Sequence, residues 1–343
     1  MHKYAVAIPV YNEENFIVNT LASFEVDNFV ENTIFILVDN YSTDNTFEKV
    51  EHFLSKNFKY KVLIVNEPRQ GVEFARKKSL DIAAEYNPKI IIGTDADTIF
   101  NKKIINEIIN FSKEKEDVFI FEATMGSAVR LHKMIYFPDF LRSTNRIWKL
   151  EYDIFGPYLF GACFAIKPSI YKKVRQNYNV HNSPVIYQNS GEDILLGRRI
   201  HYLGGSFCKG KYKVLTSDRR YSSNIYAWLT FERGKFYRNQ SNIFDQDMSG
   251  YLKNINEYRK KRIENTMVRW IRYAADAKEF ADLCMGSNEE SLVSYTRFLK
   301  FFNYSETFIN VSYDSSKNLI DKLTTDNKRR GEQLLEEYLN KEL

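Results

Sequence analysis

This sequence has few cysteines and lacks long apolar runs and repeats. Each of these features excludes a class of structure. The three cysteines, Cys163, Cys208 and Cys284, are scattered and show no CxxC or Cys/His spacing, so they predict neither a disulfide framework nor a zinc site. No apolar run approaches the roughly 18 residues of a membrane-spanning helix. The residues after Met1 run directly into a strand-like segment, so we expect no signal peptide and a reducing, cytoplasmic compartment.

A strong charge of one sign is missing as well. The 49 Lys and Arg residues exceed the 44 Asp and Glu residues by a formal net charge of +5. This excess is too small to predict nucleic-acid binding, although it suits an anionic substrate or an anionic membrane surface. With 343 residues, of which 44% are hydrophobic, the chain can form one large globular domain or one domain with an appendage.

From residue 4 to about residue 125 the sequence alternates apolar runs with segments of helical periodicity. The runs that predict buried strands are residues 4–10, 33–38, 61–66, 90–93 and 118–121. This strict alternation predicts an α/β fold, in which a mostly parallel sheet is flanked by helices and joined by right-handed crossovers.

The pattern changes after about residue 125. Further strands are expected within residues 158–167 and over residues 206–216, and Gly191 opens a helix between them. From about residue 225 the sequence predicts mainly helices. We therefore expect a first domain over residues 1–224, with halves that meet near residue 100, and a helical C-terminal region over residues 225–343.

Two carboxylates follow the fourth of these apolar runs directly. Asp95 and Asp97 lie two residues apart in the segment Thr94-Asp-Ala-Asp-Thr98, where their charges repel each other. A divalent cation removes that repulsion, because Mg²⁺ or Mn²⁺ accepts one or two carboxylates and completes its shell with water and phosphate oxygens. The alternative is a polar turn or a helix N-cap.

Polar residues also follow each of the three preceding strands. Tyr11 and Glu13 follow the first strand, Asp39 follows the second, and the segment from Arg69 to Arg76 follows the third. The carboxyl ends of parallel strands share one edge of a sheet. We therefore expect these side chains to converge with the pair of aspartates on one cleft.

Together these segments resemble family 2 of the nucleotide-sugar glycosyltransferases, whose fold is the Rossmann-like GT-A fold. The resemblance covers residue 4 to about residue 220 and leaves the helical region outside it. The matching segments are Ile8-Pro-Val-Tyr-Asn-Glu-Glu14, Val38-Asp-Asn-Tyr-Ser-Thr-Asp-Asn-Thr46, Gly71 with Ala75-Arg76, Thr94-Asp-Ala-Asp-Thr98 and Gly191-Glu-Asp193.

The resemblance implies an inverting enzyme that moves a sugar from a nucleoside diphosphate donor, with UDP favoured, to a hydroxyl of a saccharide or lipid-linked acceptor. Synthesis of a cell-surface polysaccharide or glycoconjugate is the expected setting. The donor would bind to residues 1 to about 100 and the acceptor to residues from about 100 to 224. The implied cofactor is Mn²⁺ or Mg²⁺, held by Asp95 and Asp97.

Donor binding is assigned through the same resemblance. Asp39 can accept the imide N–H of uracil, or an N–H of guanine, unless it is only a turn residue. Glu13 is alternatively a first-turn acid favoured by the helix dipole, and Arg76 is alternatively a solvated helix residue. Arg219 and Arg220 are expected to neutralise the leaving diphosphate. The full set of expected donor-binding residues is Pro9, Tyr11, Glu13, Asp39, Arg69, Gly71, Arg76, Asp95, Arg219 and Arg220.

Asp193 is the candidate general base for the acceptor hydroxyl, and Glu192 is its neighbour in the catalytic pair. The alternative is an acidic pair that only stabilises the N-terminus of its helix. The third metal ligand stays open. His201 is more simply a helix-surface residue, and the loop after the last strand offers Ser217 and Asp218.

Residues 259–272 are basic and amphipathic, with Ile263, Met267, Trp270 and Ile271 on one helical face. One interpretation is peripheral contact with an anionic membrane, which would place the protein at the inner face of that membrane. The other is a helix that docks its apolar face on the first domain.

Two other functions are compatible with parts of this pattern. A sugar nucleotidyltransferase of the same fold would favour a Gly-rich signature bearing Lys or Arg soon after the first strand, where this chain has Tyr11-Asn-Glu-Glu14. A non-catalytic nucleotide- or sugar-binding module would not need the carboxylates of Asp95, Asp97 and Asp193, and all three are present.

Overall fold

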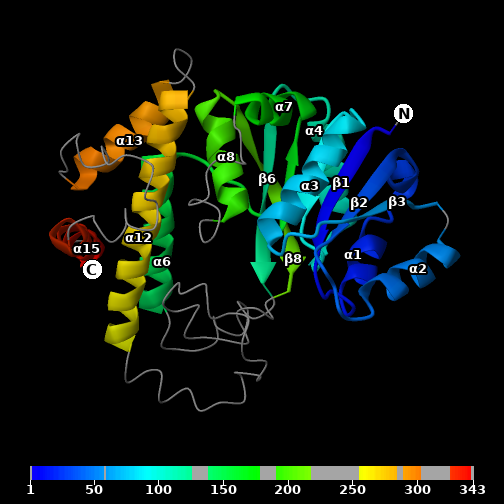
Figure 1. The fold of residues 1–343 in the computed structure, drawn as a ribbon, viewed down its shortest axis with the longest axis horizontal. Coiled ribbons are helices and arrows are strands. Elements are labelled where there is room, and N and C mark those ends of the chain that lie inside the picture. Colours follow the sequence, from blue (N-terminus) through cyan, green and yellow to red (C-terminus); the bar gives the residue numbers. More distant parts are fainter. Residues whose placement is uncertain are drawn as a thin grey trace. The chain divides into compact units, whose positions relative to one another are not determined.

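A computed structural model describes residues 2–57, 59–125, 138–177, 191–217, 255–283, 289–302 and 325–340. The chain groups into two units (Figure 1). The first unit combines residues 1–126, 158–177 and 191–217, and the second combines residues 127–157, 178–190 and 218–343. The predicted boundary after residue 224 lies outside the described residues and stays a prediction.

The first unit is organised around one sheet. Its strands are β1 (Tyr4–Val10), β2 (Thr33–Asp39), β3 (Lys61–Asn66), β4 (Ile90–Thr94), β5 (Thr98–Ile99), β6 (Val118–Met125), β7 (Cys163–Ile166) and β8 (Phe207–Thr216). Their order in space is β3-β2-β1-β4-β7-β6-β8-β5. Strands β3, β2, β1 and β4 run parallel, β6 and β8 run parallel, and β7 runs antiparallel to both β4 and β6. The mostly parallel α/β fold is confirmed, whereas the sequence does not predict the reversed direction of β7.

Helices flank this sheet on both faces. They are α1 (Ile17–Ser23), α2 (Thr46–Lys56), α3 (Val72–Glu85), α4 (Lys102–Phe111), α7 (Pro168–Asn177) and α8 (Glu192–Tyr202), with a 3-10 helix at Asp27–Asn32. Val6 and Ile8 of β1 belong to the core that α1 and α4 complete. Ala5 and Ala7 point to the opposite face, and α3 lies against β1 and β2 (Figure 1). Small side chains on that face let α3 approach the sheet closely.

The sheet switches its direction of growth at β1. Strands β2 and β3 add on one side of β1, and β4 adds on the other. Pairing of β1 with β2 continues to Val10 and Asp39, but pairing with β4 ends at Ala7 and Gly93. Beyond Ala7 the β4 side of β1 is unpaired, which accommodates Pro9 without the loss of a ladder bond. The place where β1 and β4 separate is a topological switch point, and open α/β sheets bind ligands at such points.

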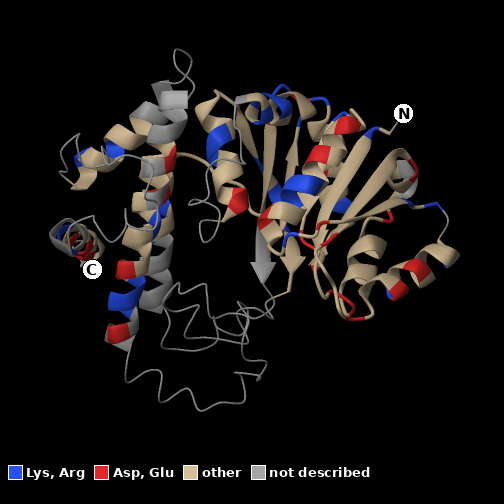
Figure 2. Cartoon of the chain, viewed as in Figure 1, with Lys and Arg blue, Asp and Glu red and all other residues tan. Residues whose placement is uncertain are grey.

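Strand β8 is the edge of the sheet for most of its length, because β5 pairs only with its last two residues, Leu215 and Thr216. Exposed lysines occupy alternate positions 209, 211 and 213 of this strand. Lysines on an exposed edge discourage pairing with another chain. Elsewhere on the described helices, Lys and Arg are interspersed with Asp and Glu (Figure 2), as the small net charge leads one to expect.

Helices alone form the described part of the second unit. They are α6 (Pro138–Phe155), α12 (Ile255–Leu283), α13 (Glu289–Phe302) and α15 (Thr325–Asn340). Helix α12 packs against each of the other three, so the predicted helical C-terminal region is confirmed. Helix α6 groups with this unit, although the sequence-based division placed it before residue 224. Within the described part of the chain, no helix is long and apolar enough to cross a membrane.

The amphipathic segment of α12 turns its apolar face inward. Ile263, Met267, Trp270 and Ile271 are all buried, and the Trp270 ring lies 6.3 Å from Phe155 of α6, centroid to centroid. Helices of its own unit therefore cover this face. A membrane contact through residues 259–272 would lack the apolar surface it needs, because that surface is already occupied.

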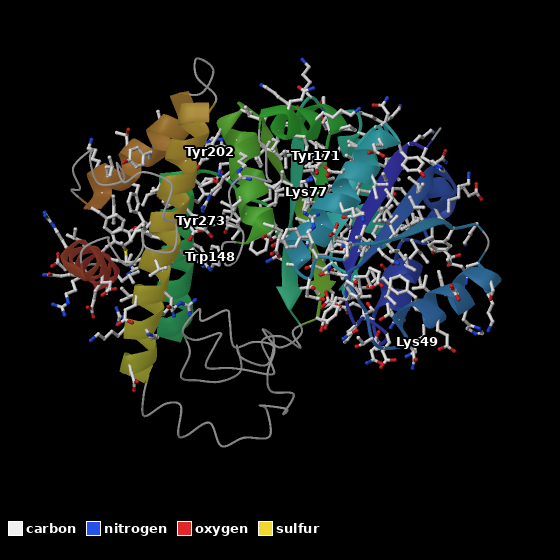
Figure 3. All side chains as sticks on the ribbon, in the orientation of Figure 1. Lys49, Lys77, Trp148, Tyr171, Tyr202 and Tyr273 are labelled. Atoms are coloured by element: carbon white, nitrogen blue, oxygen red, sulfur yellow. The ribbon has the colours of Figure 1, made fainter. Side chains whose placement is uncertain are left out.

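A buried ion pair ties α6 to α12. The Glu151 side chain is fully buried, and its Oε2 accepts hydrogen bonds from Nη2 of Arg269 at 2.8 Å and from Nε1 of Trp270 at 2.7 Å. The Arg269 guanidinium also lies 5.1 Å from the ring centroid of Trp148, on the same helix as Glu151 (Figure 3). Such a pair fixes the register of two helices, because neither charge can move without losing its partners.

Candidate active site at the carboxyl edge of the sheet

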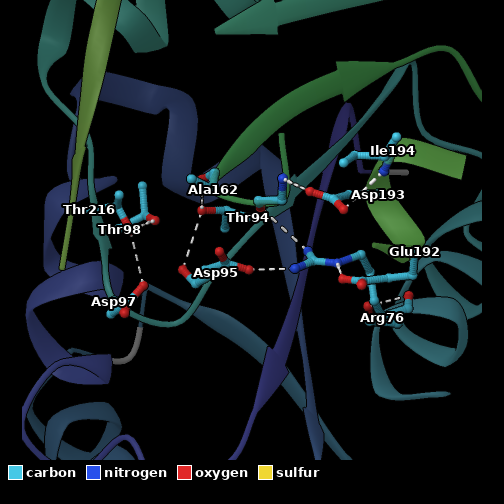
Figure 4. A network of polar contacts seen from close by, with 12 residues as sticks. Arg76, Thr94, Asp95, Asp97, Thr98, Ala162, Glu192, Asp193, Ile194 and Thr216 are labelled. Carbon is cyan, nitrogen blue, oxygen red and sulfur yellow. Dashed lines mark hydrogen bonds and ion pairs between the residues drawn. The ribbon is translucent and has the colours of Figure 1, made fainter. Parts of the chain in front are cut away.

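A buried arginine joins the residues at the end of β4 (Figure 4). Arg76 of α3 is 3% exposed. Its guanidinium pairs with the carboxylate of Asp95 and, through Nε, with Oε1 of Glu192 at 2.9 Å. Its Nη1 donates to the carbonyl of Gly161 at 3.4 Å. The alternative of Arg76 as a solvated helix residue is therefore wrong, whereas its contact with a diphosphate stays a prediction.

The reversed direction of β7 brings the remaining residues to this edge. Because β7 runs antiparallel to β4, the segment just before β7 begins where β4 ends. Thr94 Oγ1 donates to the carbonyl of Ala162 at 2.8 Å, and the backbone N–H of Gly161 donates to Oδ2 of Asp193 at 2.7 Å. Segments more than 60 residues apart in the chain therefore meet around one guanidinium.

Asp193 and Glu192 form the first turn of α8, after Gly191 with a φ of 73°. Oδ1 of Asp193 accepts the N–H of Ile194 at 2.9 Å. The carboxylate thus interacts with its own helix N-terminus, as the alternative interpretation expects, and it also lies within the Arg76 network, as a catalytic role requires. The role of Asp193 as general base stays a prediction.

The electrostatics of this network are dominated by carboxylates. Burial lowers the pKa of Arg76, but the charges of Asp95, Glu192 and Asp193 together outweigh burial, so the pKa lies above its usual range. The guanidinium is therefore permanently charged. Burial, and then the charge of Glu192, raise the pKa of Glu73 on the same helix. One cation among this many acids leaves negative charge that a further cation can neutralise.

The chemistry of Asp95 and Asp97 fits a divalent cation. The Asp95 side chain is 33% exposed. Within the described part of the chain, Arg76 bonds its Oδ1, and Oδ2 can accept a ligand. Asp97 is 9% exposed, and its Oδ1 accepts a hydrogen bond from Thr216 Oγ1 at 3.2 Å. Within the described residues, no group of three or more His, Cys, Asp or Glu side chains could hold a metal. A cation at Asp95 and Asp97 would need further ligands besides these two carboxylates, such as the phosphate oxygens that Mg²⁺ and Mn²⁺ bind in other proteins.

Of the candidate third ligands, His201 lies away from this centre and Ser217 lies beside it. His201 is near the C-terminal end of α8, about 12 Å along the helix from Asp193. Its ring lies 6.4 Å from that of Phe207, the first residue of β8, at the opposite edge of the sheet. The backbone N–H of Ser217 donates to the carbonyl of Asp97 at 3.2 Å. Asp218, Arg219 and Arg220 lie outside the described residues.

The loops after β1 and β2 are held to each other. Oδ1 of Asp39 accepts the N–H of Ser42 at 2.9 Å, and Ser42 Oγ accepts the N–H of Asn12 at 3.1 Å. The side chain of Glu13 is buried, and its N–H donates to Thr46 Oγ1 at 2.8 Å. Asp39 therefore has the turn contact of the alternative interpretation and is still only half-buried. Pro9 is buried within β1, whereas Tyr11 is 42% exposed.

Asn40, which the sequence does not single out, organises the loop after β3. Its Nδ2 donates to the carbonyls of Glu67 and Arg69 at 3.0 and 2.7 Å, and its Oδ1 accepts the N–H of Gly71 at 2.7 Å. Gly71 has a φ of 146°, which favours glycine, and it precedes α3. For Asn40, the one available sequence signal was its position directly after Asp39.

Arg69 is oriented by its neighbours. Its Nε donates to Oε1 of Glu67 at 2.8 Å, and its guanidinium lies 4.6 Å from the ring centroid of Phe74. Hydrogen bonds from Arg69 hold the pKa of Glu67 below its usual range. Half of the Arg69 side chain is exposed, so it faces solvent at the same edge as Asp39.

Gly161 is the second residue that the sequence does not identify. A Cβ at this position would lie 2.8 Å from Nη2 of Arg76 and 3.2 Å from Oδ2 of Asp193. The site therefore needs glycine here for space. The small-residue stretch over residues 160–166 was the available signal, although it indicated only a strand.

Comparisons with known proteins agree with this fold. The family model described as glycosyl transferase family 2 matches residues 5–175, a range that includes Asp39, Asp95 and Asp97 and ends before Asp193. No curated protein sequence matches. The solved mannosyltransferase PcManGT from Pyrobaculum calidifontis, in complex with GDP-Man and Mn²⁺, is 15% identical and has a TM-score of 0.50, with 95% of this chain and 86% of that chain covered. S. aureus TarS 1–349, in complex with UDP-GlcNAc, is 14% identical with a TM-score of 0.48 over 98% of this chain and 91% of that chain. At 15% identity, the likeness to PcManGT shows a shared fold. The likeness to TarS adds nothing to that conclusion.

Proposed function

The chain belongs to glycosyl transferase family 2 through residues 5–175, and on that premise we propose that it transfers a sugar from a nucleoside diphosphate donor to an acceptor hydroxyl with inversion. The observation that carries this proposal is the Arg76 network, which joins Asp95 to Glu192 directly and to Asp193 through Gly161. Donor-side and acceptor-side carboxylates thus meet at the switch point of the sheet.

The proposed chemistry is a single displacement. Asp193 takes the proton of the acceptor hydroxyl as its oxygen attacks the anomeric carbon, while the bond from that carbon to the diphosphate oxygen breaks. Attack from the face opposite the leaving group inverts the configuration. Glu192 and Arg76 hold the first turn of α8 in place during this step.

The proposed donor contacts lie along the edge from β2 to β4. Asp39 accepts an N–H of the base, with UDP favoured, and Glu13 lies beside the ribose next to the wall that Pro9 and Tyr11 form. Arg69, the backbone at Gly71, Arg76, Arg219 and Arg220 are the proposed diphosphate contacts. Asp95 and Asp97 would hold Mn²⁺ or Mg²⁺, which when bound supplies charge neutralisation for the departing diphosphate.

The acceptor and the compartment are further parts of the proposal. We assign a saccharide or lipid-linked acceptor, in the synthesis of a cell-surface polysaccharide or glycoconjugate, and action in the cytoplasm. Two of the cysteines, Cys163 and Cys208, are free. Burial raises the pKa of both thiols, and nearby acids contribute to a pKa of about 11 for Cys208. Both therefore stay protonated, in keeping with structural roles in a reducing compartment.

The experiment compares wild-type protein with Asp193→Asn. Hydrolysis and transfer are measured with UDP-glucose and GDP-mannose as donors, with and without Mn²⁺. The amide keeps the size of the carboxylate but cannot take a proton, so transfer should fall by about 10²–10⁴-fold while nucleotide affinity stays within about twofold. The matched control is Glu85→Gln, an exposed acid on α3, which should behave as wild type.

Four outcomes count against the proposal. A product with retained anomeric configuration excludes the single displacement. An Asp193→Asn enzyme with more than about a tenth of wild-type transfer removes Asp193 as base, given the usual contribution of such groups. Formation of a nucleotide sugar from a sugar phosphate and a nucleoside triphosphate would instead identify a nucleotidyltransferase. Nucleotide binding without turnover of any donor would identify a binding module.

A further inference from the structure

Tyr41, in the loop after β2, has a backbone conformation that is unusual for its residue type. Its φ is 67°, in the left-handed region, where a Cβ is unfavourable. The other non-glycine residues with positive φ in the described chain are Asn12 and Asn87, a type that tolerates this region. Tyr41 is also 60% exposed, so burial of its ring does not offset the strain.

The turn itself does not require a tyrosine. Its shape is set by the hydrogen bond from the Ser42 N–H to Asp39 and by two bonds to Asn12. These run from the Asn12 N–H to Ser42 Oγ at 3.1 Å and from the Thr43 N–H to Asn12 Oδ1 at 2.7 Å. Glycine at position 41 would take the same conformation without strain. A strained residue whose side chain takes part in none of these bonds points to a role in binding.

A second exposed tyrosine lies next to this one. Tyr11 and Tyr41 each precede one member of the hydrogen-bonded pair Asn12–Ser42, and they are 42% and 60% exposed. They follow neighbouring strands whose last paired residues are Val10 and Asp39. Because paired strands are about 4.8 Å apart, the backbones that carry these two exposed rings lie close to half-buried Asp39.

We propose that Tyr41 is a donor-specificity residue whose ring stacks on the planar base of the nucleoside diphosphate, with Tyr11 as the neighbouring aromatic surface. This inference rests on the proposed function. Aromatic rings suit the faces of a base, and the Asp39 carboxylate suits an N–H on its edge.

The base is favoured over an acceptor sugar by position. Strand β1 lies between β2 and β4, so Asp39 and Asp95 are two strand spacings apart, roughly 10 Å. That separation leaves room for a ribose between a base at Asp39 and a diphosphate at Asp95. An acceptor, by contrast, has to reach Asp193, beyond Asp95 on the other side of β1.

The test uses the full chain and calorimetric titration with UDP, GDP and pyrophosphate, all with Mn²⁺. Base–aromatic stacking changes affinity by about 5- to 150-fold, so Tyr41→Gly should weaken UDP or GDP binding by about tenfold or more. Pyrophosphate, which has no base, should bind as before. Tyr41→Phe keeps the ring and should stay within about twofold, and Tyr41→Asn, which tolerates the left-handed region, should match the glycine variant. Tyr86→Ala, at an exposed ring on the end of α3, is the control.

The melting temperature distinguishes a binding role of Tyr41 from a purely structural one, because replacement of a structural tyrosine would lower it. Tyr41→Gly removes the strain, so its melting temperature should equal or exceed that of wild type while its nucleotide affinity falls. Unchanged affinity for UDP and GDP overturns this inference, as does an equal loss for pyrophosphate or a loss confined to the acceptor KM. If folded wild-type protein binds neither nucleotide, the proposed function fails as well, which separates the two failures.

Discussion

Arg76 carries a single positive charge that Asp95, Glu192 and Asp193 all share. The first two make direct ion pairs, and the third is reached through the backbone of Gly161. An arginine suits this position, because its guanidinium offers several donors in one plane and stays charged when buried. The positions of the three acids therefore depend on one side chain of α3.

Replacement of Arg76 by glutamine should destabilise the first unit, because the acids lose their common cation. Removal of one partner of a buried pair costs about 3–5 kcal/mol. The Asp95 side chain is 33% exposed, so water screens part of this loss and a value at or below the lower end is expected. Urea unfolding followed by circular dichroism measures it.

The control for this variant is Lys77→Gln on the same helix. Lys77 pairs with Asp81 four residues along at 2.8 Å, and both side chains are partly exposed. The loss of such a pair should cost at most about 0.5 kcal/mol. Equal unfolding midpoints for the two variants would show that the Arg76 network contributes no more than an ordinary surface pair.

Gly161→Ala probes the same network from the other side. The added methyl group would lie within 3.2 Å of both the Arg76 guanidinium and the Asp193 carboxylate, so one of them has to move. Overpacking of this kind costs about 1–3 kcal/mol, and transfer should fall with it because Asp193 is displaced. Gly204→Ala is the control, since the φ of 75° at Gly204 would be strained for alanine but the space around it is open. It should lose stability without losing activity per folded molecule.

Strand β7 shows where sequence patterns stop being informative. Apolar runs predict β1, β2 and β3 within a residue of their observed ends. For β1 and β2 the reason is that buried parallel strands have a distinct composition. The apolar pattern of residues 160–166 suits a parallel strand and an antiparallel strand equally well, so nothing local predicts that β7 is antiparallel. Strand β5 spans two residues, Thr98–Ile99, and is too short to have a periodicity.

Sequence patterns likewise predict one part of the candidate site and not the other. Convergence of Asp39 and Asp95 on one edge follows from parallel strands alone, and the strand pairing confirms it. The proximity of Glu192 to Arg76 depends on β7 and the entry into α8, and their sequence positions are 116 residues apart. Only the family resemblance could suggest it. Asn40 bonds backbone groups of other residues, and Gly161 bonds side chains through its own backbone. The sequence predicts neither residue, because backbone groups leave no pattern in it.

The whole molecule offers a way to observe its two units separately. The sequence contains three tryptophans, at positions 148, 228 and 270, and all of them belong to the second unit. Tryptophan fluorescence therefore reports on that unit, whereas nucleotide titration reports on the first. Variants of either unit can be assigned to the part of the chain that they affect.

Glu151→Gln is expected to destabilise the second unit alone. The fully buried carboxylate accepts bonds from Arg269 and Trp270, and loss of its charge leaves the Arg269 guanidinium without that counter-charge. A cost of about 3–5 kcal/mol is typical, with the lower end expected since the amide oxygen can still accept one bond. The fluorescence midpoint in urea should fall, and UDP affinity of the folded protein should stay the same. Glu257→Gln, an exposed acid on α12, should change neither.

The backbone of Gly161 has a use that goes beyond catalysis. Its amide proton points at the proposed base and its carbonyl oxygen at the arginine beside the proposed metal ligand, so its nuclei sense both halves of the reaction. The protein contains 14 glycines, and selective ¹³C/¹⁵N-glycine labelling would give a magnetic resonance spectrum simple enough to isolate this one residue. Ionisation of the acid would shift the nitrogen resonance, and occupation of the donor side would shift the carbonyl resonance. The two events could then be timed against each other in the unmodified enzyme.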